Sequence, residues 1–178
     1  MKFNIIVAIC KKNNGIGLKG HLPWDIKEDL HHFSKLTKGK GNNAVVMGSN
    51  TYNSLYCDCL PGRDNFILSN TLKINFTTKN GKNIVKTFTD IDAIIESCLA
   101  NNYETAWIIG GGDIYRQFLK KNIVDTCYVT SIDRYFDCDI TFPLLSANEW
   151  KIISNKELLD KYNDKYDFNI EYIEYSKL

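Results

Sequence analysis

Short apolar runs rich in β-branched residues recur along the 178-residue chain and alternate with segments of helical periodicity. Runs without polar interruption, such as Val45–Met47 and Trp107–Ile109, suit strands that are buried on both faces, because a half-exposed strand would alternate apolar and polar residues. Such strands need helices above and below them. The alternation therefore predicts an α/β fold with a central mixed sheet, mostly parallel, that is covered on both sides.

The same pattern gives approximate bounds for the elements. We expect about eight strands, over residues 3–10, 43–48, 65–69, 83–88, 105–110, 126–133, 149–154 and 168–175. We expect about four helices, over residues 26–37, a short stretch from Thr51, 90–102 and 113–122. The last two strands, separated by the charged segment 155–167, predict an antiparallel hairpin with a long solvated loop. No repeat or break in composition divides the chain, so we expect one domain over residues 1–178.

Composition excludes several functional classes. The net charge is only +1, which argues against a nucleic-acid-binding surface. No segment approaches the roughly 20 apolar residues needed to cross a bilayer, so we expect a cytoplasmic protein with no membrane partner. The six cysteines are then expected to be free thiols. Cys57 and Cys59 form one close pair, but no second pair at zinc-like spacing follows, so no metal site is predicted.

Three carboxylates, Asp25, Glu28 and Asp29, fall within five residues just after a Pro-Trp pair. Asp25 and Glu28 have the spacing of a capping box, in which the first side chain accepts from a free backbone N–H and the second reaches back. Asp29 differs because, at 100° per residue, it falls within the apolar arc of the predicted helix. The apolar members of that arc are Ile26, Leu30, Phe33 and Leu36.

A carboxylate on an apolar helix face needs a reason, since burying an unpaired charge is costly. Two interpretations are open from the residues alone. In the first, Asp29 is structural and is paired with a hidden polar partner. In the second, Asp29 lines a cleft, where desolvation raises its pKa, and it holds or delivers a proton.

Two turns at the ends of predicted strands have the composition of ligand-binding turns. Gly110–Gly112 join a buried strand to a helix, where glycines admit close backbone approach and free N–H groups favour phosphate. Their spacing is not that of a dinucleotide GxGxxG motif, and a plain tight turn explains them as well. Gly48 ends another strand before Ser49–Thr51, whose side chains either cap the next helix or donate to a phosphate. Two such turns fit a ligand with two phosphates.

The segment Cys10–His21 is rich in Gly, Asn and Lys and joins a strand to a helix. A segment of this kind can move without unpacking a core, as active-site lids do. A plain surface connection has the same composition. The residues alone therefore favour neither a lid nor a simple loop.

Together these motifs resemble dihydrofolate reductase. The similarity runs through nearly the whole chain in one order, with LPW followed by an acid on the first helix, then MG, LPGR, IGGGDIY, VTSI and DITFP. The set is specific, although no single motif is. It implies a single-domain dihydrofolate-reductase-like fold and hydride transfer from NADPH to 7,8-dihydrofolate, giving 5,6,7,8-tetrahydrofolate for one-carbon and thymidylate metabolism. It also implies a monomer whose partner is this small-molecule substrate.

The resemblance assigns roles to individual residues around the substrate. Asp29 matches the active-site acid, which binds the pterin and, with an ordered water, promotes protonation of its imine nitrogen. Thr130 would hydrogen-bond Asp29 from the facing strand, and Trp24 would hold the water. Leu22 would lie on the loop that closes over the nicotinamide, and Arg63 would pair with the substrate's glutamate carboxylate. The other implied substrate contacts are Ile6, Ala8, Leu30, Phe33, Leu55 and Ile109.

The resemblance also implies a cofactor site around the two glycine turns, with a cis peptide bond after Gly110. Its residues are Ala8, Ile16, Gly48, Ser49, Asn50, Thr51, Ser69, Asn70, Lys86, Gly111, Gly112, Asp113, Ile114 and Tyr115. Family members that prefer NADPH carry cations where this chain has Ser49, Asn70 and Asp113. We therefore expect NADH to be tolerated, with Lys86 as the substitute cation for the adenosine 2′-phosphate.

Two other functions share these features. The pyrimidine reductase of riboflavin biosynthesis is a different reductase on the same fold, but Asp29, the LPW motif and Arg63 favour folate. A folate-binding or nucleotide-binding protein without catalysis would keep the pocket and lose turnover. Nothing in the sequence indicates a missing catalytic group, so the reductase is the preferred hypothesis.

Overall fold

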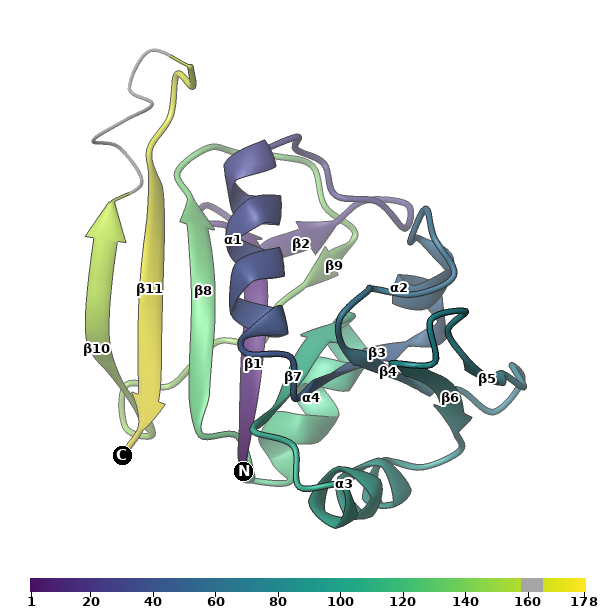
Figure 1. The fold of residues 1–178 in the computed structure, drawn as a ribbon. Helices are drawn as coiled ribbons and strands as arrows, with labels where there is room; N and C mark the ends of the chain where they lie inside the picture. The colour runs from purple at the N-terminus through teal and green to yellow at the C-terminus, as the bar shows by residue number, and fades with distance from the viewer. Residues whose placement is uncertain (158–164) are drawn as a thin grey trace.

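The structure is a computed structural model that describes residues 1–157 and 165–178. Within these ranges, eleven strands form one sheet flanked by four helices (Figure 1). The strands are β1 (Lys2–Cys10), β2 (Gly15–Gly17), β3 (Asn43–Gly48), β4 (Asp64–Leu68), β5 (Asn75–Thr77), β6 (Ile84–Phe88), β7 (Thr105–Gly110), β8 (Thr126–Ile132), β9 (Ile140–Thr141), β10 (Trp150–Glu157) and β11 (Ile170–Lys177). The helices are α1 (Lys27–Lys38), α2 (Ser49–Asn53), α3 (Ile91–Ala100) and α4 (Gly112–Lys120).

All eight predicted strands are present, and three short ones were missed. The missed strands β2, β5 and β9 have two or three residues each, which is too short to display a periodic pattern. All four predicted helices are also present, with α2 beginning at Ser49 rather than Thr51. In the C-terminal hairpin, β10 extends to Glu157, into the predicted loop, and residues 158–164 of that loop lie outside the described residues.

The sheet is parallel at its centre and antiparallel at its edges, in the order β10-β11-β8-β1-β7-β3-β4-β6-β5. Each neighbouring pair from β8 to β6 is parallel. The hairpin strand β11 joins β8 antiparallel, and β10 pairs antiparallel with β11. At the other edge, β5 is antiparallel to β6. These pairings confirm the predicted mixed α/β sheet with an antiparallel C-terminal hairpin.

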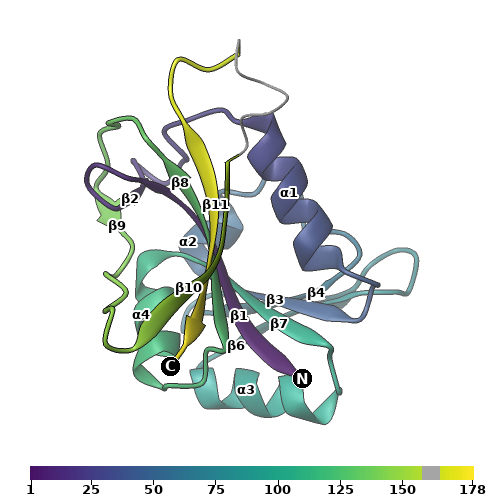
Figure 2. The ribbon, with the colours of Figure 1, turned by 90° about the vertical axis from the view of Figure 1, so that its left-hand side faces the viewer.

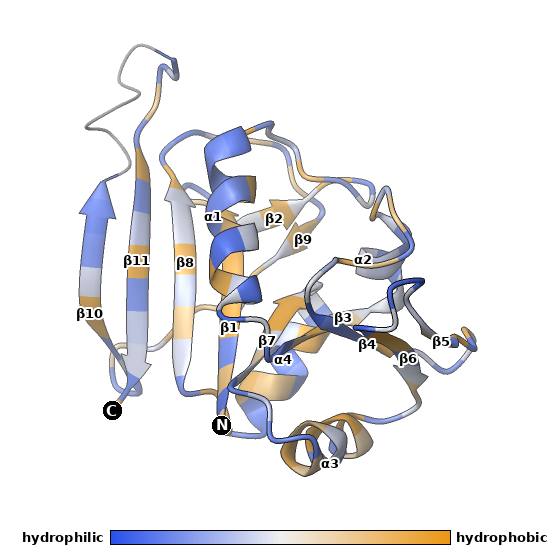
Figure 3. Cartoon of the chain, viewed as in Figure 1, coloured by the Kyte–Doolittle hydropathy of each residue, from blue (hydrophilic) through white to orange (hydrophobic). Residues whose placement is uncertain are grey.

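Successive side chains of the central strands point to opposite faces of the sheet and pack into two hydrophobic cores, one on each face. Ile5 of β1 packs into the core that contains residues of α3 and α4, such as Ile94 and Phe118. Its neighbour Ile6 points to the other core, against which Phe33 of α1 packs. Figure 2 shows α1 on one side of the sheet and α4 on the other. Figure 3 shows β7 in hydrophobic colours, as a strand buried on both faces requires.

The predicted capping box of the first helix is wrong. Ile26 is the N-cap of α1, with no side-chain capping hydrogen bond, and Asp25 is exposed. Glu28 instead accepts from Lys165 Nζ at 2.5 Å and from the Tyr166 hydroxyl at 2.6 Å. An ammonium and a phenol are stronger donors to a carboxylate than a terminal backbone N–H, so the tertiary partners are preferred over the local cap.

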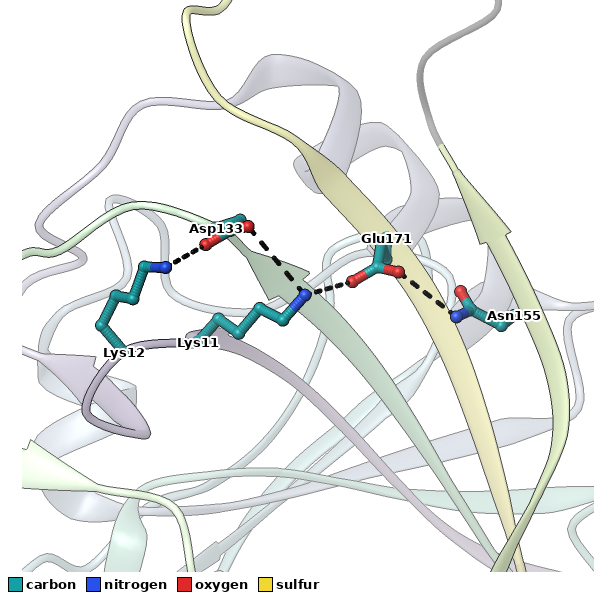
Figure 4. A network of polar contacts seen from close by, with 5 residues as sticks. All are labelled: Lys11, Lys12, Asp133, Asn155 and Glu171. Atoms are coloured by element: carbon teal, nitrogen blue, oxygen red, sulfur yellow. Dashed lines mark hydrogen bonds and ion pairs between the residues drawn. The ribbon is translucent and has the colours of Figure 1, made fainter.

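A surface network ties the end of β1 to the C-terminal hairpin (Figure 4). Lys11 Nζ lies 3.1 Å from a carboxylate oxygen of Glu171 on β11, and Lys12 Nζ lies 2.8 Å from Asp133 after β8. Asn155 of β10 donates to the other oxygen of Glu171 at 3.3 Å. Exposed pairs of this kind contribute little singly, but together they anchor the residues where the glycine-rich segment after β1 begins.

Three further findings concern the chain as a whole. All six cysteines are free, as predicted. None of the described helices has the length and apolar character to cross a bilayer. The described residues gather no group of three or more His, Cys, Asp or Glu side chains that could hold a metal ion.

Candidate active site

The main cavity lies where two neighbouring parallel strands separate. β1 pairs with β7 only as far as Ile5 and Ile108, but it stays paired with β8 as far as Cys10 and Ile132. The strands therefore part towards their carboxyl ends, where open α/β sheets bind ligands. The cavity has a volume of about 1110 Å³, above the range of about 300–1,000 Å³ usual for one small ligand. It has room for a substrate and a cofactor together.

Asp29 faces this cavity from the first turn of α1 and is only 8% exposed. Thr130 Oγ1 of β8 donates a hydrogen bond to Asp29 Oδ1 at 2.6 Å. Burial raises the pKa of Asp29, and the hydrogen bond from Thr130 opposes that shift. The two interpretations of Asp29 are therefore both met in part, because the carboxylate has a hidden polar partner and also lines a cleft.

Trp24 is buried and does not line the cavity. It packs edge-on against Phe136, with ring centroids 5.4 Å apart. Its indole N–H has no hydrogen-bond partner among the described residues. A buried unpaired donor is costly, and a water molecule is the usual partner for such a group, which matches the water-holding role implied for Trp24.

Arg63 is almost fully buried, at 2% exposure, and lines the cavity. Its Nε and Nη2 donate to the Pro61 carbonyl at 3.1 and 2.8 Å, and its Nη1 donates to Thr37 Oγ1 at 2.6 Å. These three bonds leave two of the five guanidinium N–H groups free. Desolvation lowers the pKa of Arg63, and no carboxylate of the described residues forms an ion pair with it. A buried guanidinium with free N–H groups and no ionic partner favours binding of an anionic ligand.

The two glycine turns meet in the cavity lining. An added Cβ on Gly48 would lie 3.1 Å from Ile114 Cγ1 of α4. An added Cβ on Gly110, whose φ is +116°, would lie 3.1 Å from the Tyr115 hydroxyl. The peptide bond between Gly110 and Gly111 is cis, as the resemblance implied. Both turns thus pack closely against α4, and their glycines also line the cavity, which fits a phosphate-bearing cofactor such as a dinucleotide.

The polar residues after Gly48 are not used as helix caps. Gly48 itself is the N-cap of α2, and no side chain caps that helix. Ser49, Asn50 and Thr51 instead line the cavity. The capping alternative is therefore excluded, and their side chains are available to a ligand.

The glycine-rich segment after β1 borders the cavity through Ile16, Gly20 and Leu22. It is held to the residues that precede and form β9. Asp139 N donates to the Gly17 carbonyl at 3.0 Å, and Lys19 N donates to Asp139 Oδ2 at 2.9 Å. The segment thus has the location that a lid requires.

The cavity lining contains every residue predicted for the site except Trp24 and Lys86. Lys86 lies on β6 with its ammonium 4.9 Å from the centre of the Phe88 ring. Sequence reasoning missed two cations that do line the cavity, Lys38 at the end of α1 and Arg116 on α4. Helical spacing could not have found Lys38, because at 100° per residue it falls about 80° beyond Leu30, outside the apolar arc of α1. Arg116 pairs with Asp113 at 2.5 Å.

Comparison with known proteins agrees with this geometry. The family profile described as dihydrofolate reductase matches residues 2–177. A dihydrofolate reductase of Aedes albopictus is 30% identical over 184 residues, covering 99% of this chain and 98% of the relative. That of Drosophila melanogaster is 33% identical, covering 97% and 96%, and that of Buchnera aphidicola subsp. Baizongia pistaciae is 34% identical, covering 97% and 96%. The chain belongs to the dihydrofolate reductase family.

Proposed function

We propose that this chain reduces 7,8-dihydrofolate to 5,6,7,8-tetrahydrofolate with NADPH, as one domain over residues 1–178. The observation that carries the proposal is one cavity lined by two buried, oppositely charged groups, neither of which has an ionic partner in residues 1–157 and 165–178. Asp29 supplies a carboxylate with a raised pKa, and Arg63 supplies a guanidinium with free donors. Dihydrofolate carries a pterin with donors for the first and a glutamate carboxylate for the second.

The cofactor supplies hydride when it is bound. The residues of the cavity bind the pterin and promote its protonation. Asp29 binds and polarises the pterin and raises the basicity of its imine nitrogen. The proton reaches that nitrogen through a water held near Trp24, whose indole N–H has no hydrogen-bond partner in the part of the chain that the structure describes. Leu22 and the segment around it exclude bulk water. The protein thus aligns the two reactants and controls one proton.

The preference for NADPH over NADH is proposed to be weak. Ser49, Asn70 and Asp113 line the cavity at positions where a cation would otherwise meet a 2′-phosphate. Lys86 is the substitute cation in this proposal, although its ammonium lies over Phe88. A large NADPH preference that persists in Lys86→Ala would contradict both statements.

The decisive experiment follows the loss of reduced-nicotinamide absorbance with purified protein and dihydrofolate. NADPH and NADH are compared over a range of concentrations, and the ratio of their kcat/KM values measures the preference. Turnover supports the reductase. A folded protein that binds both ligands without turnover would be a binding protein, and turnover only with a pyrimidine substrate would indicate the riboflavin-pathway reductase.

We further propose that the enzyme acts as a monomer in the cytoplasm. Six free cysteines suit a reducing compartment. Sedimentation equilibrium of the purified protein tests the oligomeric state, and a dimer at micromolar concentration would contradict it.

A further inference from the structure

The end of the cavity next to Arg63 contains a second cation that the assigned roles do not use. Lys38 lines the same cavity and is the last residue of α1. The residue before it, Thr37, accepts the hydrogen bond from Arg63 Nη1 at 2.6 Å. Lys38 therefore directly follows the residue that accepts a hydrogen bond from the buried guanidinium of Arg63.

The stem of Lys38 lies along the turn that carries Arg63. Its Cγ, Cδ and Cε atoms come within 3.5, 3.7 and 3.7 Å of the Cβ position built on Gly62, the residue that precedes Arg63. These are ordinary van der Waals distances, and the glycine is favoured here by its own backbone, whose φ is +79°. The stem is thus packed although Lys38 as a whole is exposed, as expected of a lysine that covers apolar surface with its methylenes and keeps its ammonium in water.

Neither cation has an anionic partner among the described residues, since no ion pair of Lys38 or Arg63 occurs there. Two neighbouring like charges destabilise a folded protein unless an anion lies between them. Some described lysines outside the cavity do have carboxylate partners, for example Lys11 with Glu171 at 3.1 Å. The two cavity cations therefore match a ligand with two negative charges at one end.

We propose that Lys38 binds the side-chain carboxylate of the substrate's glutamate, while Arg63 binds its α-carboxylate; the inference rests on the proposed dihydrofolate reduction. The α-carboxylate is next to the amide and lies deeper, which suits the buried, planar guanidinium. The side-chain carboxylate is two methylenes farther out and mobile, which suits a flexible ammonium at the cavity mouth. Lys38 is thus a specificity-determining residue for a dianionic glutamyl end.

The test removes the Lys38 ammonium and the side-chain carboxylate of the substrate's glutamate, separately and together. Lys38→Ala is assayed with dihydrofolate and with the dihydropteroyl-glutamine analogue, in which the side-chain carboxylate is a neutral amide and the α-carboxylate is kept. Lys35→Ala is the matched control, since Lys35 has the same charge on the same helix and does not line the cavity. KM, kcat and the salt dependence of KM are measured for each pair.

We expect Lys38→Ala to raise KM for dihydrofolate about threefold, the size of an exposed ion pair, with kcat unchanged. KM for the glutamine analogue should be equal in Lys38→Ala and wild type, and Lys35→Ala should match wild type with both substrates. Lys38→Arg should restore most of the loss. Equal effects of Lys38→Ala on both substrates, or none on either, would overturn the role of Lys38. Failure of the wild-type protein to reduce dihydrofolate would instead overturn the proposed function.

Discussion

Glu28 and Asp29 are neighbours on α1, yet their environments differ completely. Glu28 receives hydrogen bonds from Lys165 and Tyr166, chiefly the first, and these lower its pKa to about 2. Asp29 is buried, its carboxylate has the Thr130 hydroxyl as its one hydrogen-bond partner among the described residues, and desolvation raises its pKa. One residue of helical rotation, 100°, separates the two outcomes.

This difference shows where the protein leaves charge unbalanced. Outside the cavity, Glu28 has cationic and phenolic partners, and Asp133 and Glu171 have lysine partners in the surface network of Figure 4. Inside the cavity, Asp29 and Arg63 have none of opposite charge among the described residues. Unbalanced buried charge costs folding free energy, so its concentration in one cleft marks the place where a ligand completes the pairing.

The largest expected effect comes from making the Asp29 side chain neutral. Asp29→Asn keeps the shape and can still accept from Thr130, but it removes the ionisable group. We expect kcat at neutral pH to fall by about 10²–10⁴-fold, the usual contribution of a positioned acid, while NADPH and substrate binding persist. Stopped-flow hydride transfer and fluorescence titration measure the two quantities, and unchanged turnover would refute the assigned role.

Stability of the same variant separates lost chemistry from lost folding. Because the folded-state pKa of Asp29 is raised, the unfolded chain ionises first as pH rises, and stability is lost between the ordinary pKa of Asp and the raised value. Asn removes this loss. Asp29→Asn should therefore have a higher Tm than wild type at neutral pH, and a lower Tm in calorimetry would count against a desolvated carboxylate.

The second effect concerns the buried cation. Arg63→Ala should raise KM for dihydrofolate by about 10–100-fold, because a charge-assisted hydrogen-bonded pair contributes about 1.5–3 kcal/mol. KM for NADPH should change little. Arg63→Lys keeps the positive charge but lacks the planar guanidinium. Its KM for dihydrofolate should lie between those of wild type and Arg63→Ala. Urea unfolding of each variant controls for the lost bonds to Thr37 and Pro61, and equal loss of cofactor and substrate affinity would argue against a carboxylate contact.

A smaller effect is expected from the hydrogen bond that the Thr130 hydroxyl donates to the Asp29 carboxylate. Thr130→Val keeps the side-chain volume and removes the hydroxyl, whose bond lowers the pKa of Asp29. The pKa of Asp29 should rise further, and kcat/KM at neutral pH should change by about fivefold or less, as expected for one hydrogen bond of ~1 kcal/mol. Carboxyl NMR of the free protein follows the titration, and a lowered pKa would show that the hydroxyl does not favour the charged form.

The smallest effect is expected from changing Glu28, the carboxylate that has Lys165 and Tyr166 as partners. The folded-state pKa of Glu28 is about 2, below its ordinary 4.5, so its contribution is present above pH 4.5 and is lost as pH falls towards 2. Glu28→Gln should lower Tm by about 1–3 °C at neutral pH without changing kcat. Thermal melts at a series of pH values should show this difference shrinking with acidity; a constant difference would mean that packing, not charge, is responsible.

Much of the fold and part of the site could be predicted from local pattern. The apolar runs at Val45–Met47 and Trp107–Ile109 predicted buried parallel strands, and helical periodicity alone placed Asp29 on an apolar face. Strands β2, β5 and β9 escaped because two or three residues show no period. The proposed capping of α1 by Asp25 failed because a capping motif describes only neighbours in sequence.

The sequence by itself determined the elements, the glycine turns and the presence of a carboxylate where a helix faces the core, since these depend on periodicity and on residues within a few positions. Only the tertiary structure decided which partners those groups have. Thr130 meets Asp29 across 101 residues and Lys165 meets Glu28 across 137, and Lys38 and Arg63 share a cavity because α1 packs beside the turn after α2. Burial and pairing depend on contacts between distant segments, and those exist only once the sheet has assembled.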